Sequence, residues 1–208
     1  MNNVFLIYLI LNGNLKLKHR KVQLQRWFDK FKELKTFNLE DFNLKTFPLI
    51  NLSYSKITIE DGWLSGFTEA DGCFSLRISK QRGKDYVKIN CILDQKNGED
   101  VLNEISMIFC NKKLAKLRDK KNIENMYRIE MSCNDIKKLI YKDIINYYSR
   151  YKLKTLKRKS FEIWKEVIYI VLGKQPLIDP AKILYIRKLR KTNNKYLILT
   201  KKIGKSNK

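Results

Sequence analysis

The sequence predicts an α+β fold in which one αββαββα unit, with a curved antiparallel sheet, occupies the middle of the chain. The segments 73–80 and 86–93 each alternate apolar and polar residues, which is typical of strands with one buried face. A short basic turn joins them, so they are expected to pair as a hairpin. An amphipathic helical pattern follows at 99–109, and a second alternating pair, 113–118 and 126–133, comes after it. The order of these patterns predicts two hairpins, each preceded by a helix.

The helix that opens this unit is expected over residues 59–71. Thr58 can cap it with Asp61 as the acidic partner of a capping box, and Gly72 can end it. Gly66 and Ala70 are four residues apart, so they share one face and leave it almost bare of side chain. This face lets a second backbone approach closely, with Leu64 and Phe67 flanking it.

Asp71 lies in the last turn of this helix, where the helix dipole is already negative. A carboxylate there needs a neighbouring cation, and a divalent metal with oxygen ligands would supply one. The alternative is a packed helix whose small residues only fill space and whose acid is an ordinary surface residue.

The remaining chain adds helices after the second hairpin. Helical patterns are expected at 135–146 and 160–172, and a basic helix or tail begins at 180. We therefore divide the chain into an N-terminal segment, 1–55, the αββαββα domain, 56–175, and a basic C-terminal region, 176–208.

Charge separates the classes of partner. The 208 residues include 44 Lys and Arg against 21 Asp and Glu, a formal charge of +23, which favours a polyanion such as nucleic acid. A membrane partner is not expected, because the longest apolar run, Val4 to Leu11, is too short to span a bilayer. The four cysteines have no CxxC spacing and are expected to be reduced core thiols.

The polar faces of the two hairpins form a candidate DNA-binding surface. Their side-chain types both neutralise phosphates and read base edges in the major groove. The alternative is an ordinary half-solvated sheet. The candidate contacts are Ser75, Arg77, Ser79, Gln81, Arg82, Lys84, Tyr86, Lys88, Asn90, Lys116, Arg118, Arg128 and Glu130.

The nonapeptide Leu64 to Gly72 resembles the LAGLIDADG motif of homing endonucleases. It matches at Leu64, Gly66, Ala70, Asp71 and Gly72, and it has Ser65, Phe67, Thr68 and Glu69 at the other positions. The resemblance implies an αββαββα fold whose sheet lies on DNA, and an interface helix that presents Leu64, Gly66, Phe67 and Ala70.

The same resemblance implies catalytic roles. Asp71 matches the acid of the motif that binds a divalent metal, Mg²⁺. Gln95 resembles the polar residue placed near the scissile phosphates, and the stretch 151–157 resembles the segment that supplies a lysine. Lys157 fits that lysine best by its distance from Phe161, and Lys154 is the alternative; simple phosphate contact is the other interpretation of both.

One motif supplies half of such a site. A homodimer is one solution. The other solution is that the chain is the second half of a two-motif enzyme and pairs with a separate first-half chain. It is suggested by residues 9–34, which resemble the end of a preceding repeat, and by residues 38–55, which resemble a linker between repeats.

The function expected from the resemblance is intron homing by site-specific cleavage of double-stranded DNA. An intron-RNA maturase with the same fold is the alternative, and an inactive DNA-binding remnant is the third interpretation. The composition, rich in Lys, Asn and Ile, fits an AT-rich organellar genome. We expect a mitochondrion, with a chloroplast as the alternative.

Overall fold

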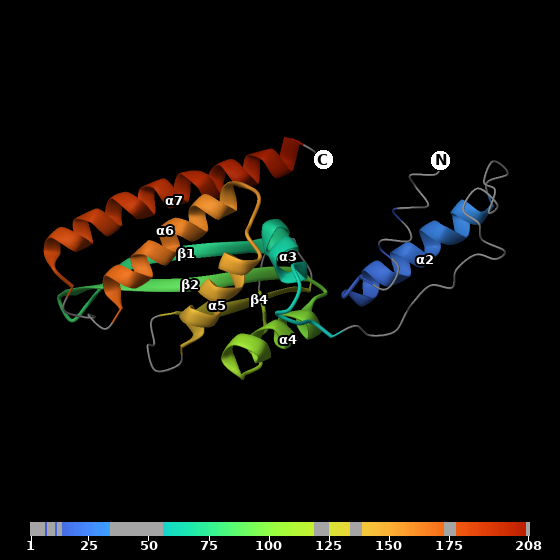
Figure 1. Cartoon of the computed structure of the whole chain (residues 1–208), viewed down its shortest axis with the longest axis horizontal. Helices are drawn as coiled ribbons and strands as arrows, with labels where there is room; N and C mark the ends of the chain where they lie inside the picture. Colours follow the sequence, from blue (N-terminus) through green and yellow to red (C-terminus); the bar gives the residue numbers. More distant parts are fainter. Residues whose placement is uncertain are drawn as a thin grey trace. The chain divides into compact units, whose positions relative to one another are not determined.

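A computed structural model describes residues 7, 11, 14–33, 56–118, 125–133, 139–172 and 178–206. The chain forms two compact units, Met1–Ile57 and Thr58–Lys208. The first contains α2 (Lys18–Lys32) (Figure 1). Leu24 and Phe28 are buried on one side of this helix, as their spacing of four residues allows. The linker expected at 38–55 lies outside the described residues.

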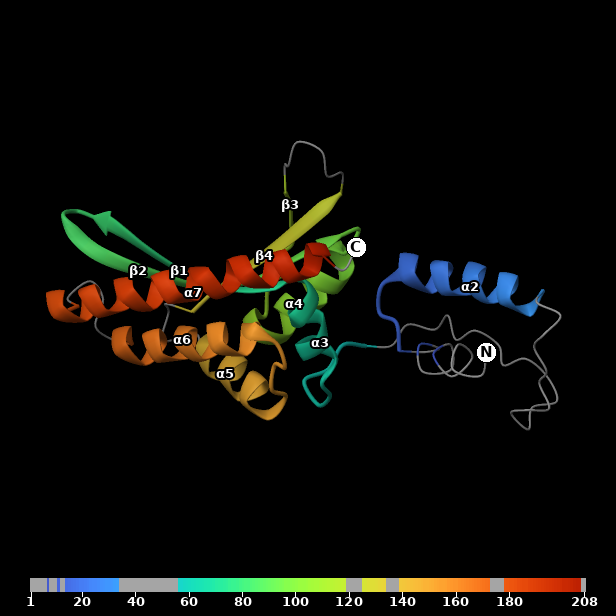
Figure 2. The same ribbon diagram turned by 90° about the horizontal axis from the view of Figure 1, so that it is seen from above.

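The second unit is an α+β domain with a four-stranded antiparallel sheet, so the predicted fold class is confirmed. Its elements are α3 (Trp63–Asp71), β1 (Gly72–Gln81), β2 (Lys84–Lys96), α4 (Glu99–Cys110), β3 (Lys116–Leu117), β4 (Met126–Ser132), α5 (Ile140–Arg150), α6 (Leu156–Val171) and α7 (Pro180–Ser206). The strand order is β1-β2-β4-β3. Figure 2 shows α5 and α6 on one side of the sheet.

The covered face of the sheet holds the core. Val87, Ile89, Cys91 and Leu93 alternate along β2 and are fully buried, as predicted. Phe74 of β1 meets the rings of Tyr148, Phe161 and Trp164 at centroid distances of 5.4, 5.2 and 5.4 Å. Trp164 also donates its indole N–H to the Asn90 carbonyl, 3.2 Å away. The aromatic cluster therefore fixes α5 and α6 against β1 and β2. We call the opposite, polar face the open face.

The tight turn between β1 and β2 has positive φ angles at its two central residues. Arg82 and Gly83 have φ of 49° and 77°, the left-handed values that a two-residue hairpin turn requires. This turn sets the register, in which Arg77 lies opposite Lys88 and Gly72 opposite Leu93. Odd-numbered residues of β1 and even-numbered residues of β2 therefore share the open face.

Several predicted bounds were wrong. Helix α3 begins at Trp63 rather than at residue 59, because Asp61 Oδ1 accepts the Trp63 N–H at 2.9 Å and Thr58 Oγ1 accepts that of Glu60. The first strand of the second hairpin pairs only at Lys116–Leu117, not from 113. The N–H groups of residues 114 and 115 are bonded instead to Ser106 Oγ and Asn103 Oδ1 of α4.

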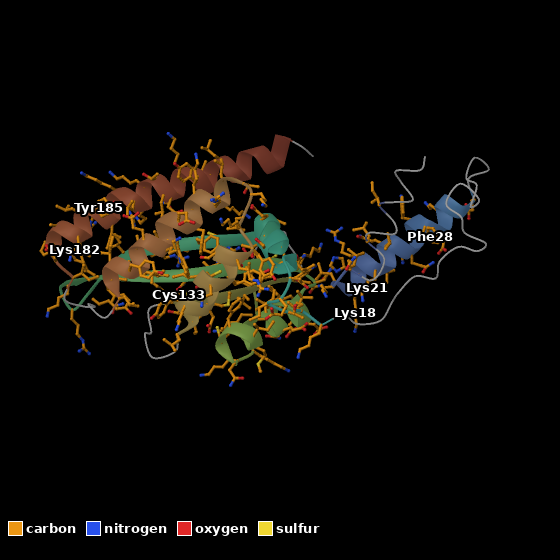
Figure 3. The ribbon with its side chains drawn as sticks, viewed as in Figure 1. Lys18, Lys21, Phe28, Cys133, Lys182 and Tyr185 are labelled. Carbon is orange, nitrogen blue, oxygen red and sulfur yellow. The ribbon has the colours of Figure 1, made fainter. Side chains whose placement is uncertain are left out.

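The C-terminal helices also differ from the predicted ranges. Helix α5 runs from Ile140 to Arg150, and residues 134–138 lie outside the described part. Helix α6 starts at Leu156, because Thr155 Oγ1 accepts the Lys157 N–H and caps it. Helix α7 runs from Pro180 to Ser206, so the basic region expected from residue 180 as a helix or a tail is a helix. It packs along α6 and β1, and its side chains Lys182 and Tyr185 are exposed (Figure 3).

All four cysteines are free thiols, and burial raises the pKa of Cys91 and Cys133. Among the residues that the structure describes, no helix is long and apolar enough to cross a bilayer.

Candidate active site and nucleic-acid interface

One side of α3 is not covered by the rest of the domain and has small residues at two of its positions. Trp63, Gly66, Phe67 and Ala70 recur at helical spacing and are exposed or half-buried; we call them the α3 stripe. The rings of Trp63 and Phe67 stack at 5.1 Å with 16° between their planes. A Cβ added at Gly66 would meet nothing within 4 Å. The stripe therefore offers a surface on which a second helix can pack closely.

Leu64 does not belong to this surface. We expected it to flank the small residues, but it is fully buried, with 0% of its surface exposed, in the domain's own core. Thr68, one turn further on, is buried beside it. The prediction of Leu64 as an interface residue is therefore wrong, because the domain's own packing already uses that side of the helix.

Polar contacts hold the buried side of α3 in a fixed rotation. Ser65 Oγ donates to the Tyr151 carbonyl at 2.7 Å, and Thr68 Oγ1 bonds the Tyr148 hydroxyl at 2.6 Å. Tyr147 Oη accepts the Ser65 N–H and donates to the Asp61 carbonyl. Burial raises the pKa of Tyr147 to about 12 and that of Tyr148 well above its ordinary value. Both phenols are therefore neutral, and their hydrogen bonds orient the helix.

The side chain of Lys157, from α6, reaches the C-terminal end of α3, the helix that ends at Asp71. Its Nζ donates to the carbonyls of Thr68, Glu69 and Ala70 at 2.9, 2.6 and 3.2 Å, and its surface is 5% exposed. Burial lowers the pKa of Lys157, while the charges of Glu69 and Asp71 act to raise it. A cation at this position satisfies the last carbonyls of the helix. Part of the positive charge that Asp71 needs at the negative end of the helix dipole is thus supplied by Lys157 of the same chain.

Glu69 makes the complementary contact. Its carboxylate accepts the N–H groups of Lys154 and Thr155 and the hydroxyl of Thr155, at the start of α6. The two helix ends are therefore each stabilised by a charge from the other helix: the Glu69 carboxylate of α3 lies at the N-terminus of α6, and the Lys157 ammonium of α6 lies at the C-terminus of α3. Sequence reasoning missed Glu69 as a site residue, since only the fold brings its carboxylate to this turn.

The structure brings Asp71, Lys157 and Gln95 to the same end of the sheet and leaves the Lys154 side chain exposed. Asp71 is exposed and directly precedes Gly72, which pairs with Leu93. Gln95, two residues along β2, is 8% exposed and donates to the Lys96 carbonyl. The roles predicted for these four residues remain predictions.

The β1–β2 half of the open face is strongly basic. Arg77 and Lys88 lie directly opposite each other and are both exposed. Like charges in opposing positions repel, so a bound anion would stabilise this pair. The same half carries the predicted contacts Ser75, Ser79, Gln81, Arg82, Lys84 and Tyr86, of which Ser75 and Tyr86 are half-buried and the others exposed.

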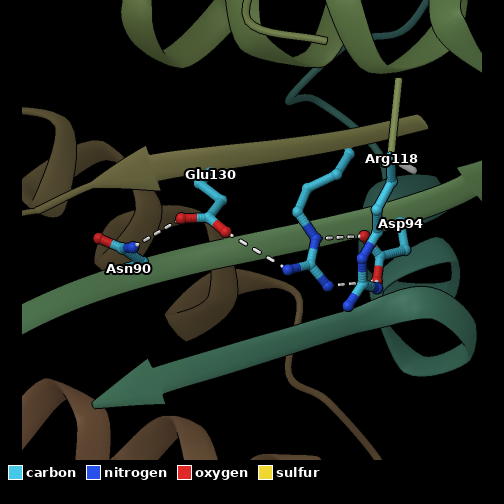
Figure 4. Close-up of polar contacts among 5 residues, drawn as sticks. Asn90, Asp94, Arg118 and Glu130 are labelled. Atoms are coloured by element: carbon cyan, nitrogen blue, oxygen red, sulfur yellow. Dashed lines mark hydrogen bonds and ion pairs between the residues drawn. The ribbon is translucent and has the colours of Figure 1, made fainter. Parts of the chain in front are cut away.

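The β2–β4 half is different, because its charges are paired. Asp94 bonds both Arg118 and Arg128, and Glu130 bonds Arg128 and Asn90 (Figure 4). Lys116 is exposed beside them. Asn90 is only 2% exposed, so its prediction as a direct DNA contact is wrong. Asp94 was not predicted as a site residue. The sequence pattern that could have identified it is an acidic residue among the basic residues on the polar face of the predicted strands.

Solved structures of homing endonucleases share this fold. The crystal structure of the homing endonuclease I-TnaI aligns with a TM-score of 0.54 at 15% identity, over 70% of this chain and 99% of that one. An archaeal intron-encoded homing endonuclease, I-Vdi141I, in a structure with DNA, aligns with a TM-score of 0.51 at 23% identity, over 65% and 82%. At these identities the likeness shows the fold.

Sequence comparison shows the family. The model of the LAGLIDADG endonuclease family matches residues 64–168, just over half of the chain, and the chain belongs to this family. It is 30% identical over 200 residues to the probable intron-encoded endonuclease 4 of Neurospora crassa. That alignment covers 93% of this chain and 32% of the relative, so the chain spans about a third of that protein's length.

Proposed function

We propose that the chain is a site-specific double-strand DNA endonuclease that acts in intron homing by Mg²⁺-dependent hydrolysis of phosphodiester bonds. The observation that carries the proposal is the position of Asp71: an exposed carboxylate at the end of a helix whose α3 stripe has open space at Gly66. Packing a second such helix on the stripe would bring two carboxylates together beneath the open face. The structure of I-Vdi141I with DNA supports a DNA substrate, and the name of the Neurospora protein supports an intron-encoded endonuclease.

The donor chemistry fits magnesium. Mg²⁺ is usually held by one or two carboxylates together with water and phosphate oxygens. Asp71 supplies one exposed carboxylate per chain, and the scissile phosphates would supply further oxygens. When bound, the metal would stabilise negative charge on the phosphoryl group.

The chain's own residues then position the reaction. The β1–β2 half of the open face binds the phosphate backbone, Gln95 orders the attacking water, and the stripe sets the spacing between two Asp71 side chains. Lys157 acts on Asp71 through the end of α3, and Glu69 fixes α3 against α6. Lys154, whose side chain is exposed, is available for phosphate contact.

The partner that covers the α3 stripe is a second copy of this chain or a separate first-half chain. This chain covers about a third of the Neurospora relative, so pairing with a separate first-half chain is supported as much as pairing with a second copy. Sedimentation with and without DNA separates them, since a compact homodimer on a near-palindromic site would contradict the half-enzyme.

The direct test is cleavage. The chain is incubated with Mg²⁺ and DNA of one locus, with and without the intron, and the intron-less DNA alone is expected to be cut. A chain that cuts both, or cuts equally in EDTA, would contradict the proposal. We place the activity in the mitochondrion, on the organellar composition and the intron-encoded relative.

An intron-RNA maturase is the second candidate, favoured by α7. From Pro180 to Ser206 this helix has no acid and repeated Lys and Arg, and it lies along α6 and β1. Splicing support that survives Asp71→Asn would favour the maturase.

A further inference from the structure

Five side chains on the open face form one hydrogen-bonded group, the Asp94 network, that joins β2, β3 and β4 (Figure 4). Asp94 and Arg128 face each other in the register of β2 and β4. Arg118 follows β3, and Glu130 and Asn90 extend the network along the sheet. The members come from segments far apart in sequence, and only the sheet register brings them together.

Asp94 is the centre of the network. Its Oδ1 accepts Arg128 Nε–H at 2.6 Å, and its Oδ2 accepts Arg128 Nη2–H at 2.7 Å, which is a two-bond fork. The same Oδ2 accepts Arg118 Nη1–H at 2.8 Å. The bonds to Asp94 raise the pKa of Arg128. A forked arginine–carboxylate pair fixes the plane of the guanidinium as well as its position.

The network is unsuited to holding phosphates. Its two guanidinium groups are balanced by the carboxylates of Asp94 and Glu130, so its formal charge is zero. The opposing pair Arg77 and Lys88, by contrast, meets no acid in an ion pair among the described residues. Counterion release, which drives phosphate binding, is therefore expected from the β1–β2 half rather than from the Asp94 network.

The bonding pattern leaves donors for a ligand. Arg128 uses three N–H groups of its guanidinium, two on Asp94 and one on Glu130, and Arg118 uses one. A guanidinium has five N–H donors. Two parallel N–H groups are what the O6 and N7 acceptors of guanine require in the major groove. Both arginines therefore keep donors while their orientation is restricted.

We propose that Asp94 is a specificity-determining positioning residue: it orients Arg118 and Arg128 to read base edges and withholds their charge from the phosphates. This inference rests on the proposed DNA function. Without Asp94, two side chains of only 22% and 30% exposure would repel each other and would be free to turn towards phosphates.

The test compares the full wild-type chain, Asp94→Asn and Glu166→Gln. The control removes the same charge from α6, which packs on the covered face, where Glu166 accepts the Tyr185 hydroxyl. Each protein is used to select duplexes from a pool of random sequence, and its affinity for a fixed non-cognate duplex is measured over a range of salt. Thermal unfolding verifies that each variant is folded.

Asp94→Asn is expected to lose about tenfold of base discrimination at a few adjacent positions. Its affinity for the non-cognate duplex should rise, with a salt slope steeper by about one. Glu166→Gln should keep the wild-type preference. Arg118→Gln is the second variant, and it should lose preference at a subset of the positions that Asp94→Asn affects.

Full wild-type preference in Asp94→Asn would overturn the inference, as would an Arg118→Gln effect at unrelated positions. If Asp94→Asn does not fold, the Arg118→Gln result decides. A wild-type chain that binds no duplex would instead refute the proposed function, which distinguishes the two failures.

Discussion

Lys157→Met separates a structural role of this lysine from a purely catalytic one. Methionine keeps the length of the side chain and its apolar stem but removes the ammonium group. Since Lys157 Nζ donates to three carbonyls at the end of α3, the substitution should lower both stability and cleavage.

The expected loss follows from the contacts. The Thr68 carbonyl also accepts the Gly72 N–H, so it keeps a partner. The Glu69 and Ala70 carbonyls each lose a charged donor, and such a bond contributes roughly 1.5–3 kcal/mol. The gain from no longer burying a cation, whose pKa burial lowers, offsets part of this. We expect a net loss of about 2–4 kcal/mol.

Thermal unfolding measures it. A loss of this size should lower the Tm by about 5–15 °C for a domain of this length. Lys154→Met is the matched control, because the Lys154 side chain is exposed and only its backbone N–H bonds Glu69. The control should change stability by less than about 0.5 kcal/mol.

The reasoning would be refuted by a Lys157→Met protein that unfolds at the wild-type temperature yet no longer cuts DNA. That result would mean that the ammonium contributes nothing to the end of α3 and acts only on the substrate. Lost stability with residual cleavage would instead identify Lys157 as a positioning residue.

Three further perturbations probe other parts of the structure. Gly66→Leu should keep or raise the stability of the isolated chain, by up to about 1 kcal/mol, because a Cβ there meets nothing and leucine favours helices. Sedimentation should show that association is lost, and cleavage assays that cutting is lost. A variant that still associates would show that the α3 stripe is not the interface. Burial raises the pKa of Tyr147 to about 12, so its proton is held more tightly in the folded chain than in the unfolded one. The stability it contributes should be complete below pH of about 10 and decline as the pH rises towards 12, and Tyr147→Phe should have a lower free energy of unfolding in denaturant titrations at pH 8 but a shallower decline; an unchanged slope would contradict the burial argument. Removal of residues 196–208 should weaken DNA binding in a gel-shift assay without moving the cut, since Asn193, which bonds Phe74 O and Ser160, is retained; a moved cut site would show that this end of α7 contributes to register.

The parts of the fold that the sequence predicted correctly were those with a clear periodicity of apolar residues and the turn between β1 and β2. The alternation along 86–93 identified the buried face of β2, and the helical pattern at 99–109 identified α4. What failed depended on competition for hydrogen bonds. Ser106 and Asn103 take the N–H groups that would have lengthened β3, and Asp61 moves the start of α3.

The site was only partly visible in the sequence for a related reason. Asp71 stands in a recognisable motif, and its exposed position agrees with that motif. Leu64 and Asn90 were assigned to surfaces because helical and strand periodicity give the direction of a side chain but not what covers it. Glu69 and Asp94 gained their partners from segments 85 and 24 or more residues away. No local pattern reports such contacts.

The central claim is that Asp71 belongs to an active site that cuts DNA. It is tested most directly by comparing wild type with Asp71→Asn on the intron-less duplex in Mg²⁺, with binding and double-strand cleavage measured on the same samples. Because Asp71 is exposed and lies beyond the buried contacts of α3, the variant should fold and bind DNA as the wild type does, yet leave the duplex uncut. Cleavage by Asp71→Asn at the wild-type rate would contradict the account.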